Sequence, residues 1–125
     1  MKRILIVDDA ATVRMYHRNL LEAAGYAVDE AVNGIEALEK ALQQPFDLYV
    51  VDINMPKLDG YGFLRELRSQ DVFQAPAIMV STEAESNDHQ RAYAAGANVY
   101  LIKPVKPEQL LIHVKLLIGE GKVLT

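Results

Sequence analysis

The sequence predicts an α/β fold in which helices cover both faces of a five-stranded parallel sheet. Two hydrophobic patterns alternate along the 125 residues. Short apolar runs rich in β-branched residues, which suit strands buried on both faces, are followed by stretches with apolar residues at helical spacing. The order of strand then helix occurs five times, at a repeat close to the roughly 30 residues of a βαβ unit. Right-handed connections then produce a doubly wound sheet.

The expected strands are apolar at nearly every position, as in a sheet that is covered on both faces. They are carried by the runs Ile4–Val7, Tyr26–Val28, Leu48–Ile53, Ala77–Val80 and Val99–Ile102. The second strand is expected to end at Glu30–Ala31.

Apolar residues at helical spacing predict the helices between and after these strands. The first three are marked by Val13, Tyr16, Leu20, Leu21 and Ala24, by Ile35, Leu38, Ala41 and Leu42, and by Phe63, Leu64 and Leu67. The fourth, Ser86–Ala95, is rich in alanine and weakly amphipathic, so we expect it to be poorly anchored. The fifth is entered through Pro107 and is marked by Leu110, Leu111, Val114, Leu117 and Ile118. Glycines at the joints, where a positive φ or a close approach is often needed, are Gly25, Gly34, Gly60 and Gly96.

Length and composition predict one globular domain, residues 1–125, without an output domain. Hydrophobic residues make up 50% of the chain and charged residues 24%, which is an ordinary globular balance. The absence of cysteine excludes a disulfide framework, a zinc–thiolate site and a thiol nucleophile. The net charge of −4 disfavours a basic nucleic-acid binder, and no apolar run is long enough for a membrane span or a signal peptide. We expect a cytoplasmic protein that binds neither nucleic acid nor membrane.

Residues that could carry chemistry gather where the expected strands end. Asp8 and Asp9 follow the first strand, and Asp52 lies at the end of the third. Ser81 follows the fourth strand, and Lys103 follows the fifth. Ligands of open α/β sheets bind beyond the carboxyl ends of the strands. Three carboxylates, one hydroxyl and one ammonium group are therefore expected to converge on one edge of the sheet.

Each of these residues also has an ordinary structural explanation. Asp9 could cap the first helix, Ser81 could cap the fourth helix, and Lys103 with the proline after it could form only a turn. Asp52 stands among apolar residues and is expected to be half-buried, and such a carboxylate needs a partner. The ordinary explanations would all have to hold at the same edge of the sheet by chance, so we favour a common site.

A bound cation would neutralise the charge of three neighbouring acids. Without it the acids repel one another, so that some stay protonated. Mg²⁺ prefers oxygen ligands. Together with the Lys103 ammonium group, it would suit an incoming phosphoryl group, whose oxygens need neutralising. A carboxylate can itself be the nucleophile and become an aspartyl phosphate, and Ser81 could donate a hydrogen bond to a phosphoryl oxygen.

The order and spacing of these residues resemble the signature of response regulator receiver domains of the CheY-like, single-domain kind. The matching residues are Asp8–Asp9, Asp52, Met55–Pro56, Asp59–Gly60, Ser81 and Lys103–Pro104. The resemblance covers the whole chain. It implies the flavodoxin-like strand order 2-1-3-4-5, for which CheY is itself a known example, and that order does not follow from the hydrophobic pattern.

The resemblance also implies a role for each site residue. Asp52 would accept a phosphoryl group from a sensor histidine kinase. The ligands of Mg²⁺, for which Mn²⁺ could substitute, would be Asp8, Asp9, Asp52 and the backbone carbonyl of Asn54. Asp8 would act largely through water. Lys103 would pair with Asp52 or its phosphate, and the Lys103–Pro104 peptide bond is expected to be cis, which about 5–6% of X-Pro bonds are.

Ser81 and Tyr100 would form the switch of the family. Phosphorylation would draw the Ser81 hydroxyl inward, and the Tyr100 ring could then turn in beside the fourth helix. The alternative for Tyr100 is an edge-strand residue with its ring on the surface. Asn54 and Glu83 occupy the positions that tune the lifetime of the phosphoryl group, and this pair favours fast turnover. Two departures are serine where threonine is commoner and Thr82 where the usual residue is smaller.

The expected protein is a monomeric switch and not an enzyme, apart from slow self-dephosphorylation. The fourth helix, fifth strand and fifth helix would form the contact face for a downstream protein. The candidate contact residues are Ala92, Tyr93, Tyr100, Val105, Lys106 and Gln109. Neither the kinase nor the downstream partner is identified by the sequence, and a flagellar motor switch in chemotaxis is one candidate. A phosphorelay intermediate or a phosphate sink is the alternative.

Two other classes of protein fit the residues less well. A haloacid-dehalogenase-like phosphatase also uses an aspartate nucleophile with Mg²⁺, but it needs a second aspartate where Asn54 stands. A flavodoxin-like flavin carrier would need a hydroxyl- and glycine-rich loop where Asp8 and Asp9 stand. A degenerate, purely structural receiver is a further alternative, although no signature residue is missing.

Other polar residues receive ordinary explanations. The three histidines, which we expect at separate, solvated or half-buried helix positions, are His17, His89 and His113. The basic residues near the start, which we expect on a solvated face, are Lys2, Arg3, Arg14 and Arg18.

Overall fold

The fold is a five-stranded parallel sheet with strand order β2-β1-β3-β4-β5 and five helices, as predicted. The structure, a computed structural model, describes residues 1–83 and 86–120. The strands are β1 (Arg3–Val7), β2 (Ala27–Ala31), β3 (Leu48–Asp52), β4 (Ala77–Ser81) and β5 (Val99–Ile102). The helices are α1 (Ala11–Ala23), α2 (Gly34–Gln43), α3 (Gly60–Arg68), α4 (Ser86–Ala95) and α5 (Pro107–Ile118). Within the described residues, no helix is both long and apolar enough to cross a membrane.

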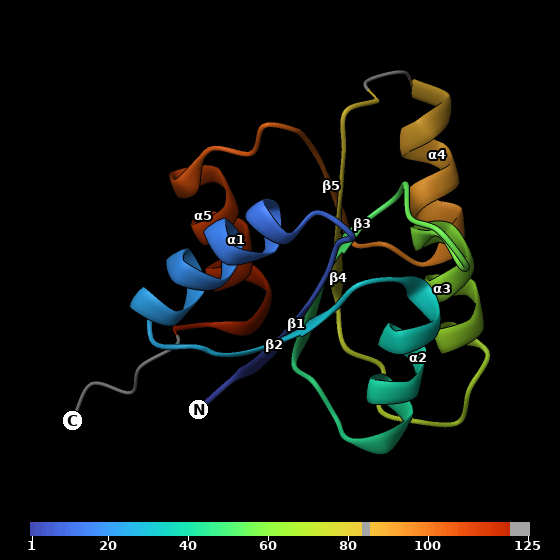
Figure 1. Ribbon diagram of the computed structural model, residues 1–125, viewed down its shortest axis with the longest axis horizontal. Coiled ribbons are helices and arrows are strands. Elements are labelled where there is room, and N and C mark those ends of the chain that lie inside the picture. Colours follow the sequence, from blue (N-terminus) through green and yellow to red (C-terminus); the bar gives the residue numbers. More distant parts are fainter. Residues whose placement is uncertain (84–85, 121–125) are drawn as a thin grey trace.

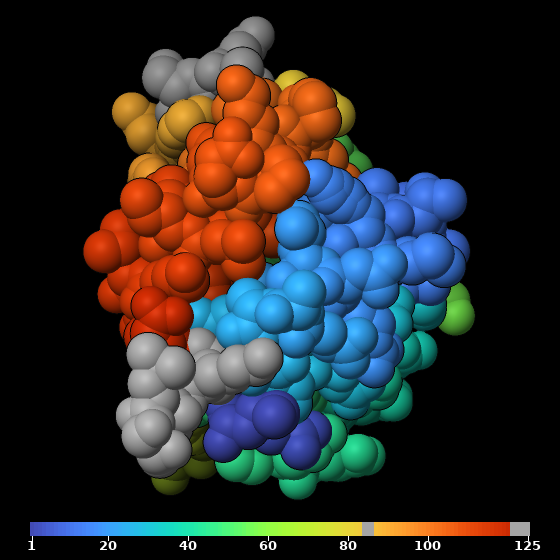
Figure 2. Space-filling view, turned by 90° about the vertical axis from the view of Figure 1, so that its left-hand side faces the viewer, coloured from blue at the N-terminus to red at the C-terminus, as the bar shows by residue number. Residues whose placement is uncertain are grey.

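The sheet separates two hydrophobic cores, because successive side chains of a strand point to opposite faces. In β1, Leu5 and Val7 pack into the core beneath α2, α3 and α4, while Ile4 and Ile6 pack into the core beneath α1 and α5. The strands β3 and β4 alternate in the same way. Figure 1 shows α1 and α5 on one side of the sheet and the other three helices on the opposite side. Figure 2 shows α1 and α5 side by side over their face.

The carboxyl ends of four strands lie in register at one edge of the sheet. Val7 pairs with Val51 between β1 and β3, and Ser81 pairs with Ile102 between β4 and β5. The last residue of β3 is Asp52, which pairs with Val80 of β4. The chain therefore brings the residues that follow β1, β3, β4 and β5 to the same edge, as the sequence predicts.

Gly60 allows α3 to begin directly against the end of β3. A Cβ atom at this position would lie 2.5 Å from the Asp52 carbonyl oxygen and 2.9 Å from the Cα atom of Ile53. Both are backbone atoms that cannot move aside easily, so a side chain is excluded here. The Gly60 amide donates a hydrogen bond to the Ile53 carbonyl at 2.9 Å. This close contact fixes the loop between Asp52 and α3.

The helix α4 is anchored through small side chains. Ala92 and Ala95 are buried, whereas α5 buries Leu110 and Val114. Larger contacts come from two aromatic pairs: His89 stacks on Tyr100 with ring centroids 4.1 Å apart, and the Arg91 guanidinium lies 4.3 Å from the centroid of the Tyr61 ring. Because little apolar area is buried per turn, the expectation that α4 is the weakly anchored helix agrees with its packing.

Candidate functional site

Three carboxylates meet at this edge of the sheet. One carboxylate oxygen from each of Asp8, Asp9 and Asp52 lies within 4.8 Å of the others. Asp8 is 1% exposed and Asp52 is 5% exposed, while Asp9 is open to solvent. The structure therefore brings together the three acids that the sequence predicted, two of them buried.

The acids are not used to cap α1. The N-cap residue of this helix is Ala10, and no side chain accepts a capping hydrogen bond there. The explanation of Asp9 as an ordinary N-cap is therefore wrong. Instead, Asp8 Oδ1 accepts a hydrogen bond at 2.9 Å from the Ala10 amide, which fixes the turn between β1 and α1.

Lys103 reaches the acids from the end of β5. Its Nζ atom lies 2.9 Å from Asp52 Oδ1 and 3.2 Å from Asp8 Oδ2. The Lys103 amide donates a hydrogen bond to the Ser81 carbonyl at 2.7 Å. The peptide bond between Lys103 and Pro104 is cis, which confirms the prediction. One ammonium group thus faces two buried carboxylates.

Burial and like charges act together on Asp52. Burial raises the pKa of Asp52, the hydrogen bond from Lys103 opposes that rise, and the charge of Asp8 adds to it. Burial by itself would lower the pKa of Lys103, but the hydrogen bond and charge of Asp52 outweigh it, so the pKa of Lys103 is raised. The lysine therefore carries its charge at neutral pH. The site still has less positive than negative charge, because one ammonium group faces three acids.

The donor set fits a divalent cation. Carboxylate oxygens are the ligands that Mg²⁺ prefers, and the spacing of Asp8, Asp9 and Asp52 lets one ion reach all three. An ion there would also remove the like-charge repulsion that contributes to the raised pKa of Asp52. Asn54 lies in the exposed loop after β3, two residues beyond Asp52, and the role of its carbonyl stays a prediction.

Ser81, Glu83 and Tyr100 are connected by hydrogen bonds. Ser81 is fully buried, and its Oγ atom accepts a hydrogen bond at 3.1 Å from the Glu83 amide. The Tyr100 hydroxyl donates to the Glu83 carbonyl at 2.6 Å. Tyr100 is 6% exposed, so the alternative that its ring lies on the surface is wrong. Ser81 and Tyr100 are therefore connected through the backbone of Glu83.

Half of the predicted contact face is not accessible. Ala92, Tyr100 and Val105 are buried, so their prediction as partner-contact residues is wrong. Ala92 lies on the inner side of α4, and Val105 packs in the core beneath α5. Tyr93 of α4 is 51% exposed, Lys106 is exposed and Gln109 is half-buried, so these three remain accessible to a partner.

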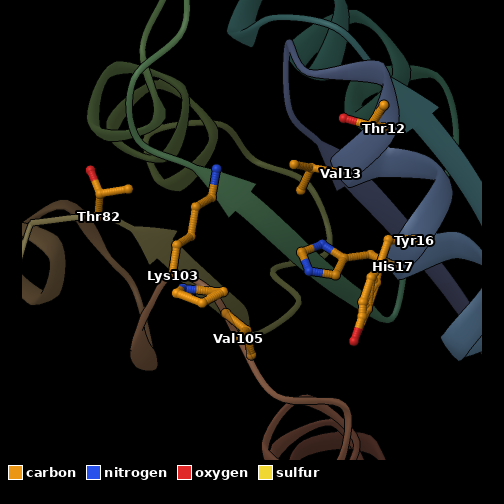
Figure 3. A pocket seen from close by; sticks show the side chains of 8 residues that line it. Thr12, Val13, Tyr16, His17, Thr82, Lys103 and Val105 are labelled. Carbon is orange, nitrogen blue, oxygen red and sulfur yellow. The ribbon is translucent and has the colours of Figure 1, made fainter.

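A cavity of about 310 Å³ opens beside the site and was not expected from the sequence. Its lining residues are Thr12, Val13, Tyr16, His17, Thr82, Lys103, Pro104 and Val105. Figure 3 shows the α1 residues on one side of this cavity and Thr82 and Lys103 on the other. The cavity therefore adjoins the lysine that contacts Asp52.

His17 forms part of that cavity wall and is 5% exposed, so the prediction of a solvated or half-buried histidine is wrong. Its Nδ1 atom is buried without a hydrogen-bond partner among the described residues. The spacing of Val13, His17 and Leu21, four residues apart, places the imidazole on the inner stripe of α1, and this signal could have predicted its burial.

Two basic residues of α1 form ion pairs with Glu30, Arg14 at 2.9 Å and Arg18 at 2.6 Å. The Arg14 side chain is 15% exposed, so the expectation of a solvated position is wrong for it, whereas the Arg18 side chain stays 37% exposed. The partner is on β2, and contacts between elements so far apart in sequence leave no local signal. His89 and His113 are half-buried on separate helices, as predicted.

We expect His17 to make the stability depend on pH. Burial lowers the pKa of His17 below its ordinary value of about 6.5, and the charge of Asp8 only partly opposes this. The stabilising contribution is therefore complete above the unfolded-state pKa of about 6.5 and is lost as the pH falls below it toward the folded-state pKa, because the unfolded chain takes up the proton first. Urea unfolding at about pH 7.5 and about pH 5.5 measures the difference.

The His17→Leu variant should lose less stability between these two pH values than the wild type. His113→Gln is the matched control, since His113 is half-buried and its Nδ1 atom faces the Gln109 carbonyl at 2.7 Å. An unchanged pH dependence in His17→Leu would contradict the assignment.

Comparisons with known proteins agree with this geometry. The family model of the response regulator receiver domain matches residues 4–115. The transcriptional regulatory protein ResD of Bacillus subtilis is 37% identical over 116 residues, which cover 93% of this chain and 48% of ResD. The solved structure of chemotaxis protein CheY4 of Vibrio cholerae is 36% identical with a TM-score of 0.88, over 94% of this chain and 98% of that chain.

A second solved structure is the receiver domain of sensor histidine kinase PA1611 from Pseudomonas aeruginosa, with a magnesium ion coordinated in its active site cleft. It is 32% identical with a TM-score of 0.87, over 95% of this chain and 98% of that chain. The chain spans no more than about half of the length of curated relatives such as ResD. From the family match over nearly all of the chain and the shared fold, the chain belongs to the response regulator receiver domain family.

Proposed function

We propose that Asp52 accepts a phosphoryl group from a histidine kinase and that the chain works as a phosphorylation switch, not as an enzyme. The observation that carries this proposal is the buried Asp52 carboxylate, which lies 2.9 Å from the Lys103 ammonium group and beside Asp8 and Asp9. Membership of the receiver family supports the same chemistry.

Asp52 is favoured over its neighbours as the acceptor. Both oxygens of Asp8 are occupied, one by the Ala10 amide and the other by Lys103. Asp9 is exposed, so water weakens the electrostatic help that it receives. Asp52 uses Oδ1 for Lys103, and no hydrogen bond to its Oδ2 atom is found in the part of the chain that the structure describes. That oxygen is the one we assign as the nucleophile.

In the proposed step, the Asp52 carboxylate attacks the phosphorus atom of a phosphohistidine. A new O–P bond forms while the N–P bond breaks, and the imidazole leaves with the electron pair and takes up a proton. Lys103 stabilises the phosphoryl oxygens by its charge, and the Ser81 hydroxyl turns to donate a hydrogen bond to one of them. Mg²⁺ held by Asp8, Asp9 and Asp52 would supply further neutralisation of the phosphoryl oxygens.

The test is incubation with a small phosphodonor such as acetyl phosphate, with Mg²⁺ or with a chelator, followed by intact-mass analysis. We expect the mass of one added phosphoryl group with Mg²⁺ and little or none with the chelator. No added phosphoryl mass on the wild type in the presence of Mg²⁺ would refute the proposed function.

The structural effect of phosphorylation would be transmitted to the α4-β5-α5 face through Ser81, Glu83 and Tyr100. A Ser81 hydroxyl that turns toward the phosphoryl group gives up its hydrogen bond from the Glu83 amide. The carbonyl of the same residue accepts from Tyr100, whose ring stacks on His89 of α4. This chain of contacts supports a two-state element that a local charge biases.

We expect the amide hydrogens of α4 to exchange faster than those of α5. The reason is that α4 buries alanines where α5 buries Leu110 and Val114. Hydrogen exchange followed by mass spectrometry or NMR measures the two helices in one sample, so α5 serves as the internal control. Equal or slower exchange in α4 would count against a helix that is easily displaced.

The lifetime of the phosphoryl group is proposed to depend on Asn54 and Glu83, which are both exposed in the loops after β3 and β4. We propose that their side chains orient a water molecule that attacks the phosphorus atom, so slow self-dephosphorylation is included in the proposal. We propose a monomer in the cytoplasm whose partners are proteins. The similarity to CheY4 supports a chemotaxis target, while a phosphorelay intermediate or a phosphate sink is the alternative.

A further inference from the structure

Arg14 of α1 connects the acidic turn to the neighbouring strand β2. Its Nη1 atom donates a hydrogen bond at 2.7 Å to the backbone carbonyl of Asp8, and its Nε atom lies 2.9 Å from Oε1 of Glu30. The side chain is 15% exposed. One planar guanidinium group therefore holds two acceptors at once, which a lysine ammonium group on its flexible stem does not reproduce.

The carbonyl that Arg14 holds belongs to the peptide group between Asp8 and Asp9. On the other side of Asp8, its amide donates to the Ala31 carbonyl of β2 at 3.1 Å. Glu30 and Ala31 at the end of β2 thus fix the peptide groups on both sides of Asp8, one directly and one through Arg14. The orientation of these peptide groups determines where the carboxylates of Asp8 and Asp9 lie.

We propose that Arg14, oriented by Glu30, is a positioning residue that holds the Asp8–Asp9 turn in the geometry needed to bind a divalent cation. This inference rests on the proposed function. Two effects of Arg14 on cation affinity oppose each other, because its positive charge repels the cation while its hydrogen bond orders the ligands. Outer-shell hydrogen bonds to metal ligands change affinity by about 10–100-fold, so we expect the ordering effect to dominate.

Arg18 provides a matched control on the same helix. It binds the other oxygen of Glu30 at 2.6 Å and carries the same charge. Its hydrogen-bond and ion-pair partners among the described residues are Glu30 and Glu22, and the Asp8 carbonyl is not one of them. Arg18→Gln therefore removes one charge, one contact to Glu30 and the ion pair with Glu22 without releasing the turn.

The test is titration of Mg²⁺ into the wild type and the variants Arg14→Gln, Arg14→Lys and Arg18→Gln, followed by calorimetry. We expect the Kd for Mg²⁺ to rise about 10-fold in both Arg14 variants and to change less than about 2-fold in Arg18→Gln. Arg14→Lys keeps the charge, so its loss of affinity would report the lost geometry. The amides of Asp9 and Ala10 should also exchange faster in metal-free Arg14 variants than in metal-free Arg18→Gln.

Tighter Mg²⁺ binding in Arg14→Gln with unchanged binding in Arg14→Lys would show a pure charge effect and overturn the inference. Equal affinity in all four proteins would overturn it as well, while leaving the proposed function intact. A wild type that binds no Mg²⁺ would refute the proposed function together with this inference. If the Arg14 variants do not fold, Glu30→Ala keeps the Arg14–Asp8 contact but removes the carboxylate that orients Arg14. It is expected to raise Kd about 3-fold, with unchanged affinity as the contrary result.

Discussion

Replacing Asp52 with Asn is expected to abolish phosphoryl uptake completely. The amide has the volume of the carboxylate but lacks the anionic oxygen that attacks phosphorus. The fold should be kept for two reasons. Lys103 retains Asp8 as a partner at 3.2 Å. Burial raises the pKa of Asp52 and so makes its charged form costly, a cost that the neutral amide of asparagine does not carry. Intact-mass analysis after incubation with acetyl phosphate and Mg²⁺ measures the loss.

The control for this prediction is Asp71→Asn, which changes an exposed aspartate in the loop between α3 and β4. It should take up one phosphoryl group as the wild type does. Asp9→Asn removes a proposed metal ligand without touching the acceptor, so we expect slower uptake that a higher Mg²⁺ concentration partly restores. Uptake by Asp52→Asn at the rate of the wild type would identify a different acceptor and disprove the assignment.

The sheet and the site could be predicted because both depend on local signals. Strands such as Leu48–Asp52 are buried at every position, so their apolar runs are visible in the sequence. In a parallel sheet the ends of such runs lie at one edge, and this places Asp8, Asp52 and Lys103 at the same edge without knowledge of the strand order. The strand order itself came from the family resemblance and was confirmed by the structure.

The features that could not be predicted depend on which side chains meet across the fold. The ion pairs of Glu30 with Arg14 and Arg18 join β2 to α1, and neither segment signals the other. Whether Ala92 faces solvent depends on the rotation of α4 about its axis, which its weak amphipathic pattern does not determine. His17 is different, since its helical spacing with Val13 and Leu21 carried the information that it is buried.

These two kinds of feature have separate tasks in the site. Residues at the strand ends carry the groups that we propose to react, and their positions follow from the backbone of the sheet. Residues on α1 and β2 hold those groups in place, and their contacts follow from side-chain packing. Sequence reasoning therefore finds the proposed acceptor and its lysine more readily than it finds Arg14, whose hydrogen bond to the Asp8 carbonyl holds the acidic turn.

Replacing Lys103 with Met is expected to lower the free energy of unfolding by about 2 kcal/mol in the absence of Mg²⁺. Removing one partner of a fully buried ion pair costs about 3–5 kcal/mol. The loss is smaller here because Lys103 keeps a fifth of its side chain exposed and because Asp52 can take up a proton when its partner is gone. Urea unfolding at neutral pH measures the change, and phosphoryl uptake should fall as well.

Mg²⁺ should stabilise Lys103→Met more than it stabilises the wild type. The ammonium group and a cation repel each other across Asp8 and Asp52, so the variant binds the cation more tightly and gains more stability by mass action. Lys106→Met, at an exposed position three residues further on, is the control and should change stability by less than about 0.5 kcal/mol. If Mg²⁺ stabilises Lys103→Met and the wild type equally, Lys103 and the cation do not share the same carboxylates. The proposed balance of charge around Asp52 would then be wrong.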